Sequence, residues 1–374
     1  MIPFNKPYLT GEELDNIKYA ILCGKISGNG VFTQKCQKYF EDRYGFRKAL
    51  LTTSCTDALE MCAILADIKQ GDEVIVPSYT FVSTALAFVR QGAKIVFADS
   101  RTDHPGINED KIEELITPKT KAIVPVHYAG IACDMDKIMF LADKYKLLVI
   151  EDAAQAIDSF YKGRPLGSIG HLAAFSFHET KNINSGEGGL LAINDDRFIK
   201  RSEIIWEKGT NRAEFFRGEV NKYGWVDIGS SFLPSEIIAA YLWAQLENLD
   251  KIQKRRIEIW EHYFKGLYDW GIKNGVKLPV IPKYGTNNGH MFYLVCKSAK
   301  QRNQIICHLK ENGIYAVSHY LSLHESAFYK KKYFGKELLN ANFYTDCLLR
   351  LPFYYELSDN DLQYICQNIH KIQF

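Results

Sequence analysis

The sequence of 374 residues has no charge excess of either sign, because 46 Lys and Arg face 44 Asp and Glu, for a formal net charge of +2. A basic excess gathered on one face is the strongest sequence sign of nucleic-acid binding, so no nucleic-acid partner is predicted. Hydrophobic residues make up 47% and charged residues 24%, which excludes disorder and collagen. At roughly 100–200 residues per domain, the length suggests two domains, although one large α/β unit with an appendage would also fit.

Long apolar runs are also missing. No run approaches the roughly 20 residues that span a bilayer. The start, Met1 to Pro7, has no basic stretch followed by an apolar one. The sequence therefore predicts a cytoplasmic protein with no membrane partner.

Three further motifs are absent. The nine cysteines are odd in number and form no Cys-x-x-Cys or Cys/His pattern, so neither a disulfide framework nor a metal site is predicted. No Gly-x-x-x-x-Gly-Lys-Ser/Thr loop supports nucleoside triphosphate hydrolysis. No Gly-x-Gly-x-x-Gly follows a first strand, which weakens a dehydrogenase interpretation.

What is present, from about residue 48 to 200, is an alternation of short apolar runs with helical patterns. Near-continuous runs at residues 73–77, 94–98, 121–126 and 146–150 are typical of parallel strands covered on both faces. The stretches 83–91 and 135–145 between them have helical patterns and predict βαβ units. Ligands of such sheets bind at the carboxyl ends of the strands.

The second half predicts a connecting helix and a smaller unit. Residues 234–270 are largely helical and indicate one long or bent helix. The remainder alternates again, with strands expected at 290–297 and 314–320 and helices at 300–312 and from 358. We expect an α/β fold with a large, mainly parallel sheet domain at residues 1–250, including the connecting helix, and a small α/β domain at 251–374.

Two residues carry the strongest chemical signal. Asp152 follows the apolar run 147–150 and places a carboxylate at a strand exit, where the protonated ring nitrogen of pyridoxal phosphate is one suitable partner. An N-cap of a following helix is the alternative. Lys181 lies in a loop rich in Gly, Ser, Thr and Asn and can form a Schiff base. A solvated loop lysine is the alternative.

Two other loops complete the pattern. Ser54 and Cys55 precede a good helix, whose N-terminus suits a phosphate, although ordinary capping is the alternative. Phe81 follows another apolar run and can stack on a flat cofactor, or pack in a core or interface. Phosphate cup, stacking ring, carboxylate and lysine together are the parts that a pyridoxal-phosphate site needs.

At these residues the chain resembles, nearly end to end, the sugar-nucleotide aminotransferases of the DegT/StrS type, within the aspartate aminotransferase (fold type I) superfamily. It most resembles those that aminate dTDP-4-dehydro-6-deoxy-D-glucose at C4. The matching stretches are Gly28-Asn-Gly30, Thr53-Ser-Cys-Thr56, Gly71-Asp-Glu-Val-Ile-Val-Pro-Ser-Tyr-Thr-Phe81, Glu151-Asp-Ala-Ala-Gln155, Ser176-Phe-His-Glu-Thr-Lys-Asn182, Gly186-Glu-Gly-Gly189, Glu207-Lys-Gly-Thr-Asn-Arg212, Phe215-Phe-Arg-Gly218 and Asp227-Ile-Gly-Ser-Ser231.

The resemblance implies roles for cofactor-binding residues. Lys181 would form the Schiff base and move the proton, and Asp152 would hold the pyridinium nitrogen. Gln155 would lie near the 3-hydroxyl of the cofactor ring, and Phe81 would stack on that ring. The cofactor phosphate would be held by Ser54, Cys55 and Ser176. Relatives that are dehydratases have histidine at the lysine position, so Lys181 argues against that branch.

The resemblance also implies a homodimer with active sites near the subunit interface. In the family a neighbouring subunit supplies a phosphate ligand from a Gly-Tyr-Asn stretch; here this stretch reads Gly229-Ser230-Ser231, so Ser231 stands where the family has asparagine. Candidates for the sugar nucleotide's pyrophosphate are Lys208, Arg212 and Arg217. His319 or His324 is expected near the sugar.

The implied reaction has two stages, in which L-glutamate converts the cofactor to pyridoxamine phosphate and a dTDP-4-dehydro-6-deoxyhexose then receives the amine at C4. The product would serve surface polysaccharides, O-antigen or enterobacterial common antigen. A 3-aminotransferase acting on a dTDP-3-dehydro-6-deoxyhexose and a non-catalytic regulator that binds pyridoxal phosphate are the alternatives. The sequence leaves the stereochemistry at C4, galacto or gluco, open.

Overall fold

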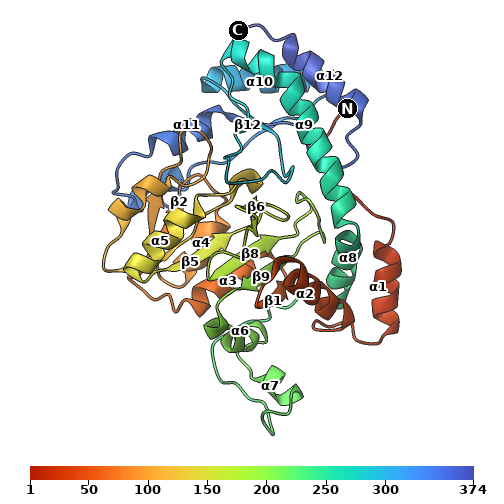
Figure 1. The fold of residues 1–374 in the computed structure, drawn as a ribbon, viewed down its shortest axis with the longest axis vertical. Coiled ribbons are helices and arrows are strands. Elements are labelled where there is room, and N and C mark those ends of the chain that lie inside the picture. Colours follow the sequence, from red (N-terminus) through yellow and green to blue (C-terminus); the bar gives the residue numbers. More distant parts are fainter.

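A computed structural model describes residues 1–374 and has a seven-stranded sheet at its centre (Figure 1). The strand order is β1-β9-β8-β5-β4-β2-β3, and β9 alone runs antiparallel to its neighbours. This confirms the predicted mainly parallel α/β fold. The strands are β1 (Lys48–Thr52), β2 (Glu73–Pro77), β3 (Lys94–Ala98), β4 (Thr120–Ile123), β5 (Leu148–Asp152), β8 (Leu172–Ser176) and β9 (Gly189–Ile193).

Both faces of the sheet are covered, as the near-continuous apolar runs predict. In β2, Val74 and Val76 pack into one hydrophobic core and Ile75, between them, into the other. The runs 73–77 and 94–98 match β2 and β3, whereas β5 ends two residues later than expected and therefore includes Asp152. The helices of this part are α1 (Glu13–Leu22), α2 (Val31–Tyr44), α3 (Cys55–Leu65), α4 (Ser83–Arg90), α5 (Met135–Tyr145), α6 (Ile199–Trp206) and α7 (Arg212–Phe216).

The connecting segment consists of two helices, α8 (Glu236–Glu247) and α9 (Leu249–Asn274), that meet at Asn248. The backbone leaves the helical region there, at φ −107° and ψ 9°. An unbroken helix over 234–270 is therefore wrong, and the bent alternative is closer. Helix α9 continues to Asn274, where Gly275 ends it with a left-handed φ of 64°.

The C-terminal part is built on a three-stranded sheet of order β10-β12-β11 (Tyr293–Val295, Leu348–Arg350 and Val317–Ser318). Helices α10 (Ala299–Glu311), α11 (Leu339–Cys347) and α12 (Asp359–His370) surround it (Figure 1). Ile2 forms a bridge with Ile314, so the first residues of the chain also lie here. The expected boundary at 250/251 falls inside α9, and the division into two domains stays a prediction.

A short hairpin of β6 (Phe160–Tyr161) and β7 (Arg164–Pro165) completes the strands. No helix of the structure is both long enough and apolar enough to cross a membrane.

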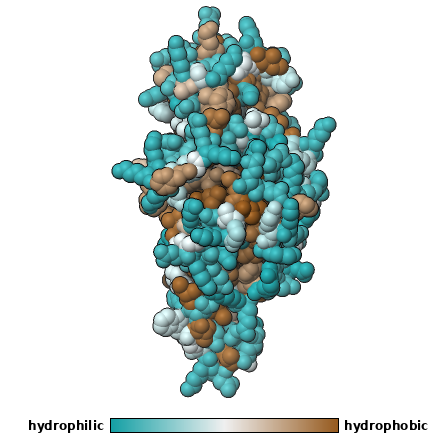
Figure 2. Space-filling view, turned by 90° about the vertical axis from the view of Figure 1, so that its left-hand side faces the viewer, coloured by the Kyte–Doolittle hydropathy of each residue, from teal (hydrophilic) through white to brown (hydrophobic).

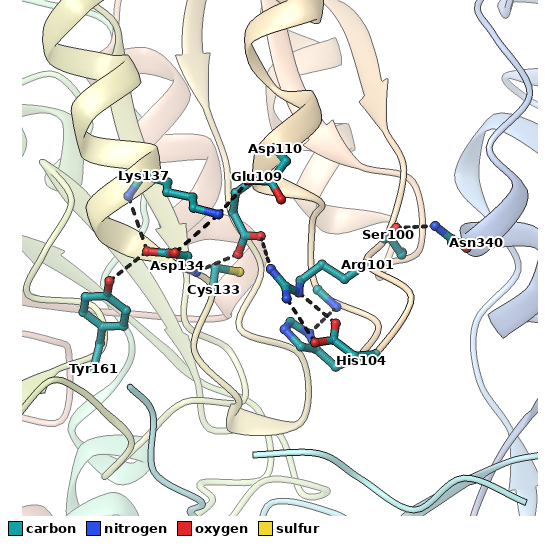
Figure 3. Close-up of polar contacts among 12 residues, drawn as sticks. Ser100, Arg101, His104, Glu109, Asp110, Cys133, Asp134, Lys137, Tyr161 and Asn340 are labelled. Carbon is teal, nitrogen blue, oxygen red and sulfur yellow. Dashed lines mark hydrogen bonds and ion pairs between the residues drawn. The ribbon is translucent and has the colours of Figure 1, made fainter. Parts of the chain in front are cut away.

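One polar network ties the loop after β3 to its surroundings (Figure 3). Arg101 donates to the buried carboxylate of Glu109 at 3.0 Å, and Glu109 accepts from the backbone N–H of Asp134 at 2.6 Å. Asp134 caps α5. Asn340 of α11 donates to the Ser100 carbonyl at 2.8 Å. The network therefore connects the sheet side of the molecule to the C-terminal part.

Candidate active site

The candidate site is a cavity of about 750 Å³ at the carboxyl edge of the sheet. Strands β1, β5 and β8 run in the same direction, so the residues at and after their carboxyl ends come together at this edge. The structure brings eight of the predicted site residues to this one cavity, namely Ser54, Cys55, Phe81, Asp152, Gln155, Ser176, Lys181 and His319.

Lys181 lies in the loop between β8 and β9 and faces the cavity. Its backbone N–H donates to the His178 carbonyl at 2.9 Å. Burial lowers the pKa of Lys181 to about 8, although the charges of Cys55 and Asp152 oppose this shift. A surface lysine has a pKa near 10.4, so Lys181 offers much more free amine at neutral pH. The alternative of a solvated loop lysine is therefore wrong.

Asp152 is the last residue of β5 and is buried. Its Oδ2 accepts from Thr84 Oγ1 at 2.7 Å, and its Oδ1 accepts from the Ala154 N–H at 3.1 Å. Burial raises the pKa of Asp152, while these two hydrogen bonds lower it. No helix starts after Asp152, so the N-cap alternative is wrong. A buried carboxylate without a cationic hydrogen-bond partner suits a protonated ring nitrogen.

The N-terminus of α3 forms another wall of the cavity. Ser54 caps α3 by accepting from the Asp57 N–H at 3.1 Å, so the capping alternative holds for its Oγ. The Cys55 and Thr56 N–H groups belong to the first turn and have no acceptor within the helix. A Cβ at Gly189 would lie 2.4 Å from the Ser54 backbone, so only glycine lets β9 approach so closely. This helix end can receive a phosphate without further rearrangement.

Two further residues that line the cavity, Gln155 and Phe81, differ in exposure. Gln155 is buried; it accepts from the Ala129 N–H at 2.6 Å and donates to the Tyr320 hydroxyl at 3.3 Å. Phe81 is 55% exposed, with its ring 6.1 Å from that of Tyr320. This exposure excludes a core role for Phe81 and leaves its ring free to cover a flat ligand.

The cavity is also lined by residues that the sequence patterns do not predict, among them Thr80, His290, Tyr320 and Arg350. Arg350 ends β12, far along the chain from Lys181. The one sequence feature that could have indicated Arg350 is its position as a charged residue within the apolar run Leu348-Leu-Arg-Leu-Pro-Phe353.

His319 lies between Arg350 and Tyr128. Nη1 of Arg350 donates to His319 Nε2 at 3.2 Å, and His319 Nδ1 lies 2.9 Å from the Tyr128 hydroxyl. An acceptor at Nε2 requires the proton of a neutral ring to be on Nδ1. Burial lowers the pKa of His319 well below its usual value, and the Arg350 charge adds to this. His319 is therefore a neutral ring at this site.

Four predicted residues, Lys208, Arg212, Arg217 and Ser231, lie outside the cavity of their own chain. They belong to the arm, residues 207–231, which includes α7 and projects from the body (Figure 1). Arg217 pairs with Glu203 and Glu219, each at 2.7 Å. Arg212 lies over the Phe216 ring, 5.2 Å from its centre.

The sheet topology and a lysine–carboxylate cavity at its carboxyl edge define a pyridoxal-phosphate-dependent aminotransferase of fold type I. The chain belongs to the DegT/DnrJ/EryC1/StrS aminotransferase family, whose pattern matches residues 7–370. It is a transaminase whose cofactor is pyridoxal phosphate, with pyridoxamine phosphate in turnover. The alternative of a non-catalytic regulator is therefore set aside.

Known proteins of this kind match over nearly the whole chain. The spore coat polysaccharide biosynthesis protein SpsC of Bacillus subtilis is 34% identical over 382 aligned positions, covering 99% of this chain and 97% of SpsC. Spr1654 of Streptococcus pneumoniae, described as a sugar aminotransferase, has a PMP-form with TM-score 0.91, 26% identity and coverage of 99% and 98%. The structure of DesV of S. venezuelae in complex with a ketimine intermediate has a TM-score of 0.90 and 29% sequence identity. It covers 99% of this chain and 98% of the DesV chain.

Proposed function

We propose that the chain transfers the amino group of L-glutamate to C4 of dTDP-4-dehydro-6-deoxy-D-glucose, giving a dTDP-4-amino-4,6-dideoxyhexose. The observation that carries an amino transfer is the cavity that Lys181 and Asp152 share. The sugar position is supported by the resemblance of the stretches at 207–212, 215–218 and 227–231. SpsC acts in spore coat polysaccharide biosynthesis, which supports a role in surface polysaccharide, here O-antigen or enterobacterial common antigen. We place the reaction in the cytoplasm.

Bound pyridoxal phosphate supplies an electron sink that stabilises the negative charge left when a proton leaves the substrate carbon. The Asp152 carboxylate would hold the protonated ring nitrogen, with Thr84 fixing its orientation. The Ser54, Cys55 and Ser176 region would hold the phosphate, Gln155 would lie at the ring hydroxyl, and Phe81 would cover the ring.

Lys181 would carry the proton in both stages. Its Nζ would move the proton from Cα of the amino donor to C4′ of the cofactor in the first stage, and from C4′ to C4 of the sugar in the second. The lowered pKa suits this task, because a group that titrates near the working pH both accepts and donates protons readily. A two-stage exchange at one site predicts ping-pong kinetics.

We also propose that the arm completes the site of a second copy in a homodimer. The arm exposes large apolar side chains, with Trp225 at 85%, Phe216 at 71% and Val226 at 56%. Hydrophobic side chains stand among hydrophilic ones at this projecting lower end (Figure 2). Such exposure is typical of a surface that meets another chain. The arm would bring Lys208, Arg212, Arg217 and Ser231 to the partner's cavity.

Mixing two inactive variants tests this arrangement. A Lys181→Ala chain keeps an intact arm, and an Arg212→Ala chain keeps an intact lysine. Random exchange would produce mixed dimers with one complete site each, and recover about a quarter of wild-type activity. No recovery, while mixed dimers are detected by native mass spectrometry, would show that the arm serves its own chain.

The reaction itself is tested with purified protein. Glutamate should convert the cofactor to its pyridoxamine form, and dTDP-4-dehydro-6-deoxy-D-glucose should convert it back. NMR of the product then shows whether the C4 amine is axial (galacto) or equatorial (gluco). An unreactive 4-ketosugar beside a reactive 3-ketosugar would replace the proposal with the 3-amino alternative.

A further inference from the structure

His290 lines the same cavity as Lys181, on the segment between α9 and β10. The residue is buried, and most of its polar groups are engaged within the chain. Its N–H donates to Asn288 Oδ1 at 3.0 Å, its carbonyl accepts from Arg256 Nη2 at 2.7 Å, and its Nδ1 lies 2.7 Å from Asn182 Oδ1. The ring nitrogen Nε2 is therefore the polar atom of His290 that is left for the cavity.

Asn182, the neighbour of Lys181 in the sequence, fixes which ring nitrogen carries the proton. Its Nδ2 donates to the Asn288 carbonyl at 2.9 Å and to Gln253 Oε1 at 2.8 Å. A main-chain carbonyl only accepts, so the amide cannot be turned round, and Asn182 Oδ1 is the atom that faces His290. An amide oxygen also only accepts, so the proton of the neutral ring is on Nδ1. Nε2 is left with an unshared electron pair, as a hydrogen-bond acceptor.

Burial keeps this ring neutral. It lowers the pKa of His290 well below its usual value, and the neighbouring groups lower it further. These neighbours are Lys181, Arg350, Arg256 and His319, and no acid is among them. Of the charges, that of Lys181 has the largest effect, which indicates that its Nζ lies near the ring. His290 is therefore an acceptor beside Lys181 that does not itself take up the proton.

We propose that His290 Nε2 accepts a hydrogen bond from Lys181 Nζ whenever that amine is not bonded to the cofactor. The inference rests on the proposed function, in which Lys181 carries the proton between the reacting carbons. The ring would hold one N–H, so that the electron pair of Nζ, or the proton it has taken, points to those carbons. A neutral acceptor serves the amine and the ammonium alike, and His290 gains and loses no proton. His290 is thus a positioning residue that acts through Lys181.

The alternative role of the ring is structural, since the Nδ1 contact ties the loop of Lys181 to the segment before β10. Two substitutions separate these roles. His290→Asn keeps a donor at the position of Nδ1 and leaves no atom at the position of Nε2. His290→Gln can place its Oε1 near the position of Nε2 and loses the Nδ1 donor. If the acceptor matters, His290→Asn is the impaired variant, and if only the tie matters, His290→Gln is.

Single-turnover rates of the two half-reactions give the first readout. In His290→Asn we expect both rates to fall roughly 10-fold or more, because Lys181 moves the proton in each half. The glutamate and sugar concentrations for half-maximal rate should change less than about 3-fold, since neither substrate contacts the ring. His290→Gln should lose less than about 3-fold in either rate. Wild-type rates in His290→Asn, or larger losses in His290→Gln, would overturn the inference.

The apo chain gives a readout that needs neither cofactor nor turnover. Reductive methylation with formaldehyde and cyanoborohydride modifies free amines, and peptide mass spectrometry follows Lys181 across pH. In the wild type the midpoint should lie at about 8. In His290→Asn it should fall by about 1, because the lost acceptor stabilises the ammonium more than the amine. In His290→Gln it should stay at the wild-type value. An unchanged or raised midpoint in His290→Asn would overturn the inference.

The same digest contains the control. Lys162, an exposed lysine paired with Asp136, should keep its midpoint in both variants. The other groups that act on the pKa of Lys181 are unchanged in both variants, namely Cys55, Asp152, Arg350 and Glu187. Unchanged melting temperature and cofactor affinity exclude misfolding. In the wild type, NMR of isotope-labelled histidine at neutral pH should show a proton on Nδ1 of His290 and none on Nε2. A proton on Nε2 would overturn the inference without any variant.

Failure of the proposed function is distinguishable from failure of this inference. If Lys181→Ala keeps full turnover, the proton role of Lys181 is wrong, while a lowered midpoint in His290→Asn would still show the contact. If Lys181→Ala loses turnover and His290→Asn matches the wild type in rates and midpoint, the proposed function stands and the inference is overturned. A loss confined to the sugar half-reaction, with a raised half-saturating sugar concentration, would also overturn it, because Nε2 would then bind a sugar hydroxyl.

Discussion

Thr84 Oγ1 donates a hydrogen bond to Asp152 Oδ2, with 2.7 Å between the two oxygens. Thr84 lies in the first turn of α4, and Asp152 ends β5, so the bond joins two elements of the site. Thr80 lies behind it, with its Oγ1 2.9 Å from that of Thr84. Burial raises the pKa of Asp152 and this bond lowers it, so Thr84 helps to keep the carboxylate ionised.

Thr84→Val keeps the shape of the side chain and removes the hydroxyl. We expect the pKa of Asp152 to rise, so the acidic limb of the rate profile should move to higher pH. A hydrogen bond to a charged group contributes about 1.5–3 kcal/mol, so activity at low pH should fall roughly 10-fold or more. Thr84→Ser keeps the hydroxyl and should therefore retain most of the wild-type activity at low pH. A Thr84→Val profile identical to wild type would contradict this role.

The amine of Lys181 should titrate in the apo chain. Because its pKa is lowered to about 8, the free amine fraction grows as pH rises through about 8. The rate at which the apo chain takes up pyridoxal phosphate, followed by absorbance, should rise with the same midpoint. Arg350→Gln should raise the midpoint, since the Arg350 charge disfavours protonation of Lys181. A midpoint at the value of a surface lysine would contradict the burial argument.

Lys181→Ala should abolish the proton transfer itself. We expect turnover to fall by about 10²–10⁴-fold, the contribution of a positioned acid–base group. The control is Lys162→Ala, an exposed lysine paired with Asp136, which should leave turnover unchanged. Full turnover in Lys181→Ala would show that the roles are assigned wrongly.

The sheet and the cofactor side of the cavity follow from local sequence. Continuous apolar runs give β2 and β3 their bounds, and a parallel sheet brings the strand exits together, which is why Asp152 and Lys181 meet. The break between α8 and α9 has no such signal, because Asn248 is not a helix breaker like Gly or Pro.

The other side of the cavity depends on contacts between distant segments. Arg350 and Tyr320 reach Lys181 only because the three-stranded sheet lies over the large one, and no local pattern encodes that approach. In the arm, the local sequence suggests more than the structure of one chain shows. Basic residues near one another suggest a pyrophosphate site, yet in this chain Arg217 is already paired with two glutamates.

A substitution at Gly189 tests whether the close approach of β9 to the N-terminus of α3, the proposed phosphate site, is needed for cofactor binding. In Gly189→Ala the new Cβ would lie 2.4 Å from the Ser54 backbone and 2.5 Å from the Cys55 nitrogen, so the start of α3 must move. We expect the dissociation constant for pyridoxal phosphate, measured by equilibrium dialysis, to rise at least about 10-fold, since a displaced cup loses hydrogen bonds to a charged group. Gly285→Ala, where the new Cβ would come no closer than 3.4 Å to another atom, is the control. Wild-type affinity in Gly189→Ala would place the phosphate elsewhere.

His104 should make the stability of the protein depend on pH. The ring lies in the loop after β3 and is buried (Figure 3). Its Nδ1 accepts from the Gly106 N–H at 3.0 Å, and its Nε2 has no partner. Burial lowers the pKa of His104 to about 4, from 6.5 in an unfolded chain. Between these values the unfolded chain binds the extra proton, so the free energy of unfolding falls as pH falls from 6.5 to 4, by about 3 kcal/mol in all.

His104→Asn separates this contribution from that of other groups. Asparagine Oδ1 can replace Nδ1 as the acceptor for the Gly106 N–H, but the side chain does not titrate. Urea unfolding at pH 7.5 and 5.5 should show the wild type losing about 1 kcal/mol more than the variant over this interval, because most of the unfolded but little of the folded histidine is protonated at pH 5.5. Any constant cost of the substitution cancels in this difference. Parallel losses in the two proteins would mean that His104 binds its proton equally in the folded and unfolded chains, so that burial does not lower its pKa.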